Sequence, residues 1–305
     1  MRVIITGGTG LIGRPLTRRL LALGYEVVVL TRSGREPSSG LIASGASHVA
    51  WDGRTADSWG HLADGAKALI NLAGENIGQG RWDAETKQRI RQSRLDAGKA
   101  VVEAVRQVKD KPEVLIQASA VGYYGSRGAE TLTEASGPGR GFLAETARDW
   151  EQSAAFVETM GVRRVIIRTG VVLTPNGGAL ARMLPSFRMF FGGPLGDGKQ
   201  FFPWIHLDDE VEAIRFLLEC EDAIGAYNLT APESVDMNGF SRELAKALHR
   251  PCFFRVPAFA LRLAFGEMAE ETILASCRAR PERLLEAGFV FKHPSLVEAF
   301  REISS

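Results

Sequence analysis

The sequence is poor in cysteine and has no long apolar run. Its three cysteines, Cys220, Cys252 and Cys277, are widely spaced and form no CxxC pair. This spacing argues against a disulfide framework and against a zinc site, so we expect no metal, and it suits a reducing cytoplasm. No apolar run approaches the roughly 18 residues that a membrane-spanning helix needs. We therefore expect no membrane partner.

An excess of charge of one sign is also lacking. The formal net charge is +1, from 37 basic and 36 acidic residues. Such a balance gives no general reason to expect a nucleic acid or an anionic membrane as partner. Met1 and Arg2 lead directly into an apolar run, so we expect no cleavable signal or transit peptide and a cytoplasmic location. Whether the chain forms a homodimer is left open.

A glycine-rich turn near the start of the chain organises the rest. It follows a β-branched run at 3–5 and precedes an amphipathic helical run at 16–23. Glycines at 7, 10 and 13 allow a sharp turn, a close approach to a pyrophosphate and close packing of helix on sheet. The alternative is a tight turn without a ligand. We expect the turn to bind a dinucleotide through the following residues: Gly7, Thr9, Gly10, Leu11, Ile12 and Gly13.

The end of the second strand, expected at 26–30, indicates which dinucleotide binds. NAD-binding units tend to place an acidic residue there for the ribose 2′-hydroxyl. This sequence has Thr31, Arg32 and Ser33 instead. A carboxylate would repel a 2′-phosphate, whereas a guanidinium can bind it through charge-assisted hydrogen bonds. We therefore favour NADP(H) over NAD(H), the alternative being that these arginines are merely solvated.

Strand and helix patterns alternate through more than half of the chain. Further strands are expected near Val49 and at 68–72, 114–118 and 165–168, with a long helix at about 84–108. The pattern predicts an α/β fold with a doubly wound parallel sheet (Rossmann), in which ligands lie at the carboxyl ends of the strands. Those ends carry the next candidate residues. They are Leu72, Ala73, Gly74 and Glu75, then Ser119, Tyr123 and Tyr124, and finally Arg168.

The remainder of the chain predicts a smaller C-terminal α+β lobe. We assign 1–175 to the NADP-binding domain, with 200–229 returning to it, and 176–199 and 230–305 to the lobe on the substrate side. The glycine- and aromatic-rich segment at 190–204 is typical of a lid. Asp208 is expected to cap a helix. A strand is expected at 253–256, followed by a helix whose Phe259 and Leu263 belong to the core.

Several motifs together resemble the extended short-chain dehydrogenase/reductases. They are the glycine turn, the Asn71–Gly74 segment, Ser119 with Tyr124-Gly125, the run at 168–173 and the Trp204–Asp209 segment. The segments at 71–75, 202–206 and 255–300 more closely resemble an atypical subgroup, the epimerase-family or sugar-nucleotide-epimerase-like proteins with a C-terminal domain of unknown function. The resemblance implies a Rossmann domain, a nicotinamide cofactor, a position for Arg168 near the cofactor cleft, and a substrate cleft against the C-terminal lobe.

The sequence departs from that family at the residues that carry its chemistry. The family uses a serine and a Tyr-x-x-x-Lys helix, whose phenol passes a proton during hydride transfer. Here Leu143 and Ala147 stand for the tyrosine and lysine, or Phe142 and Thr146 in a register shifted by one. Arg94 replaces the family's asparagine. Only Ser119 is retained.

Three substitutes for the missing proton donor follow from the sequence. Tyr123 or Tyr124 could direct a phenol at the nicotinamide, although both could equally pack beneath their loop. Glu145 could act as an acid if buried, although a single helical glutamate is more often solvated. Arg94 could bind an anionic substrate group or pair with Glu75.

Two functions remain after this comparison. One is an NADP(H)-dependent oxidoreductase or redox epimerase acting on a small-molecule substrate. The other is a non-catalytic NADP(H)-binding regulatory or scaffold protein. Phe202 stands where nucleotide-sugar enzymes of the family carry a diphosphate-binding arginine, so a smaller or more apolar substrate is favoured, with Lys199 and Arg188 as alternative cations.

Overall fold

The computed structural model describes residues 1–32, 45–78 and 80–304, without the side chains of 302–304. Its main sheet has seven parallel strands in the order β3-β2-β1-β4-β5-β7-β11. The strands are β1 (Arg2–Thr6), β2 (Glu26–Thr31), β3 (Ser47–Ala50), β4 (Ala68–Asn71), β5 (Val114–Ala120), β7 (Arg163–Thr169) and β11 (Gly225–Leu229). The chain order reverses between β1 and β4, which is the point where a doubly wound sheet binds its ligand. The predicted fold class is confirmed.

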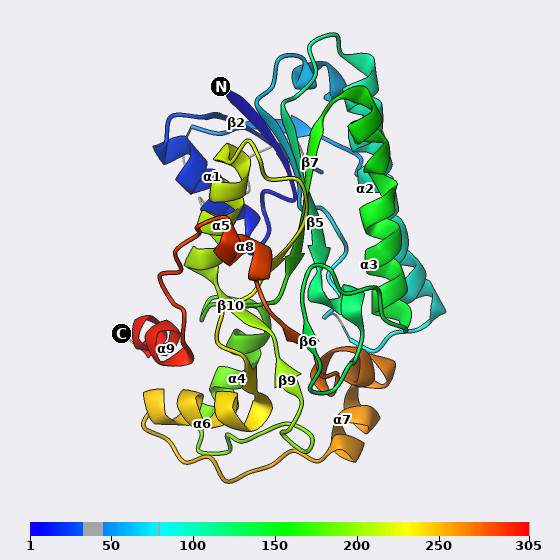
Figure 1. Ribbon diagram of the computed structural model, residues 1–305. Helices are drawn as coiled ribbons and strands as arrows, with labels where there is room; N and C mark the ends of the chain where they lie inside the picture. The colour runs from blue at the N-terminus through cyan, green and yellow to red at the C-terminus, as the bar shows by residue number, and fades with distance from the viewer. Residues whose placement is uncertain (33–44, 79, 305) are drawn as a thin grey trace.

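Helices cover both faces of this sheet. Figure 1 shows α1 (Gly13–Ala22) and α5 (Leu207–Glu219) on one face, and α2 (Ala84–Gln107) and α3 (Phe142–Ser153) on the other. The strands are apolar at consecutive positions because each of their faces is buried. Val27 and Val29 belong to the core under α1 and α5, whereas Val28 belongs to the core under α2.

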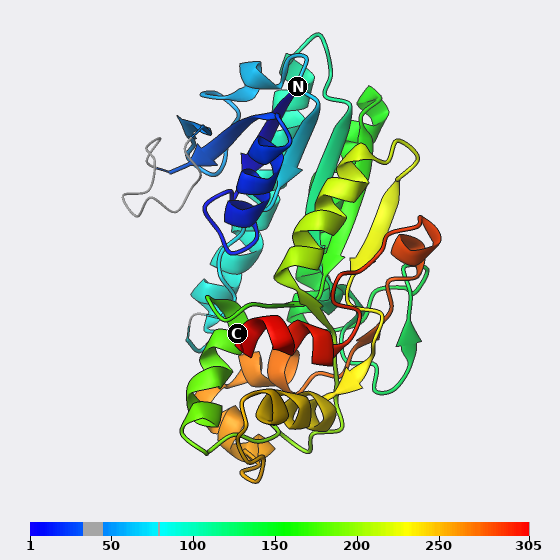
Figure 2. The same cartoon turned by 90° about the vertical axis from the view of Figure 1, so that its left-hand side faces the viewer.

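A smaller group of elements lies beyond the carboxyl ends of the strands (Figures 1 and 2). Its core includes Trp204, Phe240 and Phe300. The helical elements here are α4 (Gly178–Arg188), α6 (Met237–Ala247), α7 (Ala258–Phe265), η4 (Ala269–Ile273) and α9 (Leu296–Ser304). Short strand pairs link it to the sheet: β8 (Val171–Leu173) with β10 (Trp204–His206), β9 (Phe201–Phe202) with β12 (Val235–Asp236), and β6 (Thr131–Leu132) with β13 (Arg278–Ala279).

The C-terminal part also returns to the large sheet. Leu284 of α8 (Glu282–Glu286) and Phe289 belong to the same core cluster as the strands. Single-turn elements complete the described chain: η1 (Gly60–Ala63), η2 (Val121–Tyr124) and η3 (Ala155–Met160). The division of the chain into two domains stays a prediction.

Three local expectations are wrong. Residues 253–255 form no strand, and Val256 makes only an isolated bridge with Leu195, because the backbone pairs there at a single point. Helix α5 begins at Leu207, and its cap is His206, whose ring accepts a hydrogen bond from the Asp208 backbone N–H.

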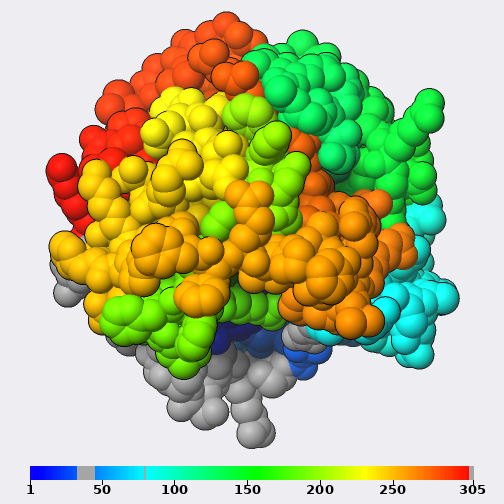
Figure 3. Space-filling view, turned by 90° about the horizontal axis from the view of Figure 1, so that it is seen from below, coloured from blue at the N-terminus to red at the C-terminus, as the bar shows by residue number. Residues whose placement is uncertain are grey.

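The third wrong expectation concerns the apolar residues of α7. Phe259 is 70% exposed and Leu263 is 76% exposed. The segment that contains α7 lies across the face seen in Figure 3. Spacing along a helix shows that residues share a face, but it does not show whether another element covers that face.

Candidate functional site

The glycine turn is closely packed on its inner side and open on its outer side. Gly7 has a φ of +69°, and a Cβ there would lie 2.7 Å from the Leu72 carbonyl oxygen. A Cβ on Gly13 would lie 2.3 Å from the Gly7 oxygen. At Gly10, apart from the adjacent residues of the chain, the one described atom within 4 Å of a Cβ would be that same oxygen, at 3.1 Å. A ligand can therefore approach the backbone at Gly10.

Within the described ranges, the N-terminus of α1 has no capping side chain and no nearby acidic residue of its own first turn that would compete with an anion. Ile12 occupies the cap position, no side chain caps the helix, and its first turn contains no acidic residue. The first N–H groups of a helix lack partners within the helix and attract negative charge. Thr9 is half-buried, and Leu11 packs against the turn at Gly177. This end of α1 fits a pyrophosphate.

The end of β2 carries positive charge as the sequence predicts. Arg32 is exposed, and the hydroxyl of Thr31 is buried with no hydrogen-bond partner in the described part of the chain. Ser33 lies outside the described residues. Neither described residue carries a carboxylate that would repel a 2′-phosphate, so this strand end fits NADP(H).

The loop after β4 connects the glycine turn to Arg94. The Ala73 N–H donates to the Thr6 hydroxyl, which donates to Asn71 Oδ1. A Cβ on Gly74 would lie 3.0 Å from Arg94 Cζ. The described structure therefore brings the Leu72–Glu75 segment, the glycine turn and Arg94 to one edge of the sheet.

Three of the candidate residues belong to one buried network. Ser119 Oγ donates to Glu151 Oε1 at 2.6 Å, and Arg168 makes two hydrogen bonds to the same carboxylate, at 2.9 and 3.0 Å. Arg168 Nη1 donates to Tyr124 Oη at 3.0 Å, and that hydroxyl donates to Asn228 Oδ1 at 2.7 Å. Arg168 also lies over the Tyr123 ring, 3.6 Å from its centroid.

This network holds its groups in fixed ionisation states. Burial raises the pKa of Tyr124 to about 12, and Arg168 offsets only part of that rise. Burial disfavours the charge of Arg168, but the hydrogen-bonded Glu151 outweighs this effect and raises the pKa of the guanidinium. Tyr124 is wholly buried and Ser119 is 4% exposed. Both hydroxyls are therefore engaged in hydrogen bonds with other buried groups.

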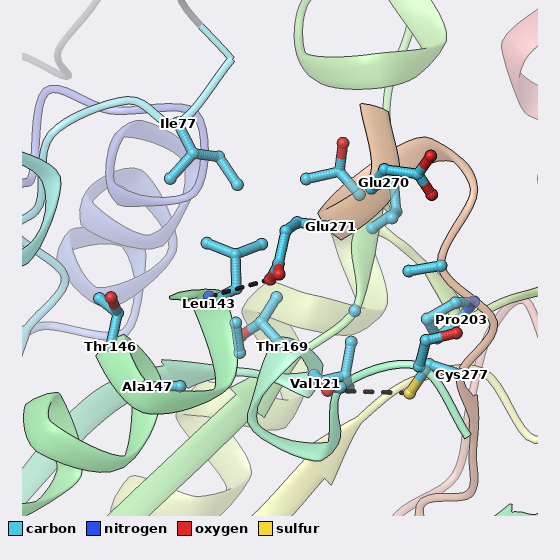
Figure 4. A pocket seen from close by; sticks show the side chains of 18 of the residues that line it. Ile77, Val121, Leu143, Thr146, Ala147, Thr169, Pro203, Glu270, Glu271 and Cys277 are labelled. Carbon is cyan, nitrogen blue, oxygen red and sulfur yellow. Dashed lines mark hydrogen bonds between the residues drawn. The ribbon is translucent and has the colours of Figure 1, made fainter. Parts of the chain in front are cut away.

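A cavity of about 290 Å³ opens where β5, β7 and the start of α3 meet η4 (Figure 4). Leu143 and Ala147 both line it, together with Thr146, whereas Phe142 does not. The first of the two registers considered for α3 is therefore the one that faces the cavity. Ala120 also lines it and the adjacent Ser119 does not, because consecutive strand residues point to opposite faces.

Among the candidate residues from the sequence, Arg94 is the one that places a charged side chain in the lining of this cavity. It is half-buried, and its Nη1 donates to the carbonyl oxygens of Glu75 and Ile90 at 3.1 and 2.8 Å. Its guanidinium stacks on Trp150, 4.9 Å from the ring. Burial lowers the pKa of Arg94 to about 10, and Glu75 partly counteracts this. Arg94 therefore remains a cation at neutral pH.

Glu145 lies elsewhere. Its side chain is exposed on α3 and does not line the cavity. The acidic groups at the cavity are Glu270 and Glu271 of η4. Glu271 accepts hydrogen bonds from the backbone N–H groups of Phe142 and Leu143 at the start of α3 (Figure 4).

The sequence interpretation missed several residues around the cavity. Glu271 and Cys277 come from a segment more than 120 residues beyond the start of α3, so no local pattern indicates them. Burial raises the pKa of the Cys277 thiol to about 12. The sequence pattern could have indicated that Glu210 is buried, because it occupies the apolar stripe of α5 that also holds Ile214 and Leu217.

His206 has a neighbour that the sequence did not reveal. His293 stacks on it with ring centroids 3.9 Å apart, and ligand atoms of these two residues and Asp208 lie within 4.8 Å of one another. The groups have other partners, however. His206 Nδ1 accepts from the Asp208 N–H, Asp208 pairs with Lys292, and His293 Nδ1 contacts Asp209. We assign no metal to this cluster.

Comparisons with known proteins agree with this geometry. A model of the NAD dependent epimerase/dehydratase family matches residues 3–230, and a model of a domain of unknown function (DUF1731) matches residues 256–303. Epimerase family protein YfhF of Bacillus subtilis is 38% identical over 304 residues, which cover 99% of this chain and 98% of that protein. A chloroplastic SDR39U1 homolog of Arabidopsis thaliana is 39% identical over 305 residues, covering 99% and 86%.

A solved structure extends the comparison. The crystal structure of human epimerase family protein SDR39U1 (isoform2) with NADPH has a TM-score of 0.87 and 31% identity, and the match covers 100% of this chain and 99% of that one. UDP-glucose 4-epimerase of Thermus thermophilus, in complex with NAD, has a TM-score of 0.76 at 21% identity and covers 100% and 98%. The second likeness shows the fold alone. No helix in the described ranges has the length and apolar character needed to span a bilayer.

Proposed function

Because the chain belongs to the NAD dependent epimerase/dehydratase family, we propose that it is an NADP(H)-dependent oxidoreductase or redox epimerase that acts on a small molecule in the cavity beside Arg94. The NADPH in the human relative supports the cofactor assignment, as do the uncapped start of α1 and the cation at Arg32. The cytoplasmic location stays a prediction.

The chain's own residues would hold the cofactor at the switch point of the sheet. Gly10 and the start of α1 would bind the pyrophosphate, Arg32 would bind the 2′-phosphate, and the Leu72–Gly74 segment would lie beneath the cofactor. When bound, the dihydronicotinamide supplies a hydride to a carbonyl carbon, or accepts one from an alcohol.

The observation that carries the proposal is the position of Arg94. Its Nη1 donates to two backbone carbonyl oxygens. The rest of the guanidinium can therefore donate to a substrate oxygen. As a carbonyl is reduced, negative charge develops on its oxygen, and a fixed cation within a largely apolar cavity stabilises it.

Deuteride transfer tests this function. NADPH carrying deuterium on one or the other face of C4 is incubated with diacetyl, benzaldehyde, pyruvate and menadione. We expect one face to transfer its label to at least one acceptor. Label retained with every acceptor, despite NADPH binding measured by calorimetry, would overturn the oxidoreductase proposal.

Arg94→Met separates binding from chemistry. We expect the rate of deuteride transfer to fall about 100- to 1,000-fold, the usual loss when one donor to a developing oxyanion is removed, with little change in the Kd for NADPH. Arg91→Met is the matched control, since Arg91 is exposed on the same helix and pairs with Asp149. Equal losses in both variants would contradict the role of Arg94.

One observation favours the second function, a non-catalytic NADP(H)-binding protein. Leu143 and Ala147 face the cavity at the positions where the resemblance places the family's tyrosine and lysine. General acid–base assistance is worth about 100- to 10,000-fold, and neither side chain can supply it. Retention of label with tight NADPH binding is the result that this second function predicts.

A further inference from the structure

Glu210 is a buried carboxyl group with one hydrogen-bond partner. It lies on α5 with no exposed surface, and Thr169 Oγ1 donates to its Oε1 at 2.8 Å. Its second oxygen, Oε2, is buried and has no hydrogen-bond partner among the residues that the structure describes. An ionised carboxylate in such a place is costly, so the protonated acid is favoured.

No described cation pairs with Glu210. Of the arginines on β7, Arg168 binds Glu151, Arg164 binds Glu158, and Arg163 donates to backbone carbonyls. Other titratable groups on elements packed against this part of α5, or on α5 itself, are the following: Arg14, Arg18, Arg19, His206, Asp208, Asp209, Glu212, Arg215, Glu219, Lys292 and His293. Burial raises the pKa of Glu210 to about 8, and the hydrogen bond from Thr169 offsets little of that rise.

Thr169 connects this acid to the cavity. It ends β7, at the edge of the sheet where ligands bind, and it lines the cavity together with Ala120, Leu143 and Ala147 (Figure 4). A threonine hydroxyl can accept one hydrogen bond while it donates another. When Glu210 is protonated at Oε1, the 2.8 Å contact becomes a hydrogen bond from the carboxyl O–H to Thr169 Oγ1. The threonine can then take the Glu210 proton while it gives its own proton to a group in the cavity.

We propose that Thr169 and Glu210 are the proton-donating pair of the cavity, in place of the tyrosine and lysine that the family uses. The inference rests on the proposed function. In the reductive direction a C–H bond forms at the carbonyl carbon with the hydride of the dihydronicotinamide, which is oxidised. The C=O π pair moves to oxygen, that oxygen takes the Thr169 proton, and Thr169 takes the proton of Glu210. Thr169 contacts the substrate, and Glu210 acts through it and is left as the carboxylate.

A titration tests the pair without any substrate. The protein is labelled with ¹³C at the glutamate side-chain carboxyl, and the resonance missing from Glu210→Gln is assigned to Glu210. We expect a midpoint near pH 8, which rises in Thr169→Val because that variant loses the hydroxyl that stabilises the carboxylate. A midpoint below pH 6, or one that Thr169→Val leaves unchanged, would overturn the pairing.

The catalytic half is tested with the carbonyl compound that accepts label in the deuteride panel. We expect Thr169→Val and Glu210→Gln to slow transfer about 100- to 10,000-fold and to abolish the pH dependence centred near 8. Thr169→Ser should restore both the rate and the pH profile. Glu212→Gln, on the same helix and paired with Arg19, is the control that should behave as the unaltered protein.

The outcomes separate the two proposals. If the unaltered protein transfers no label to any acceptor, the proposed function fails and this inference fails with it. If it transfers label, and both pair variants keep the rate and pH profile, only the pair is wrong. Circular dichroism of each variant identifies loss of folding, and the serine variant keeps the test decisive if the valine variant does not fold.

Discussion

At the scale of single residues, one side chain decides the cofactor prediction. Arg32 is exposed at the end of β2, where a guanidinium can bind a 2′-phosphate and a carboxylate would repel it. We expect Arg32→Asp to weaken NADPH binding at least tenfold more than NADH binding, as charge-assisted hydrogen bonds are worth about 1.5–3 kcal/mol. Calorimetry with both nucleotides measures this difference.

The control for this variant is Arg106→Asp. Arg106 is also exposed, but it lies in the last turn of α2 at the far edge of the sheet. It should leave both affinities unchanged. If Arg32→Asp weakens the binding of NADPH and of NADH equally, Arg32 does not bind the 2′-phosphate.

The buried carboxyl group of Glu210 also leads to a prediction about how the free energy of unfolding depends on pH. Its pKa rises from an ordinary value of 4.5 to about 8 in the folded protein, so the folded state holds the proton more tightly than the unfolded state does. The stability that this group contributes is full below pH 4.5 and is lost as the pH rises through about 8. The loss reaches at most ~1.4 kcal/mol per pH unit.

Urea unfolding at a series of pH values measures that slope. We expect Glu210→Gln to flatten the decline between pH 5 and pH 8, because the amide carries no proton to lose in this range. The matched variant Glu212→Gln should retain the decline. A flat profile in the unaltered protein would mean that Glu210 is already ionised in the folded state.

At the scale of elements, the start of α3 depends on a segment far away in the chain. Gly141 precedes the helix with a φ of +107° and has no side chain that could cap it. The carboxylate of Glu271 takes this role through the N–H groups of Phe142 and Leu143. The C-terminal part of the chain thereby holds the helix whose Leu143 and Ala147 line the cavity.

We expect Glu271→Ala to lower the free energy of unfolding by about 1–2 kcal/mol, the usual cost of losing a helix cap together with its charge at the N-terminus. Urea unfolding gives the value. Glu270→Ala is the control, since Glu270 is exposed and pairs with Arg262 at the surface, where such a pair is worth about 0–1 kcal/mol. Indistinguishable losses would remove the capping role.

Elements were predictable from the sequence where the pattern is local. The parallel strands read as apolar runs because they are covered on both faces, and the glycine turn follows from backbone sterics within eight residues. The cap of α3 by Glu271 was not predictable, because its two partners are about 130 residues apart. The exposure of Phe259 and Leu263 was also missed, since an apolar stripe does not show whether a neighbour covers it.

At the scale of the whole molecule, the cofactor should stabilise the fold. The residues that we assign to it lie at or just after the carboxyl ends of β1, β2 and β4 and at the start of α1. A bound dinucleotide would therefore contact several elements at once. At a concentration of 100 times its Kd, a ligand that binds only the folded state stabilises it by about 2.7 kcal/mol. We expect NADPH to raise the Tm by several degrees.

Thermal unfolding with NADPH or NADH at equal concentration measures this effect. The shift with NADH should be clearly smaller, and the difference between the two nucleotides should disappear in Arg32→Asp. Equal shifts in the unaltered protein would contradict the preference for NADP(H).

The sequence by itself determined the doubly wound sheet, the glycine turn to which we assign the dinucleotide, and the loss of the Tyr-x-x-x-Lys pair, because strand periodicity, glycine sterics and residue identity are local properties. Only the tertiary structure decided which polar groups meet. Folding takes Ser119, Tyr124 and Arg168 into a buried network and sets Thr169, with Glu210 behind it, beside the cavity. Hydrogen bonds depend on distances between side chains from separate strands and helices, and those distances exist only once the elements are packed.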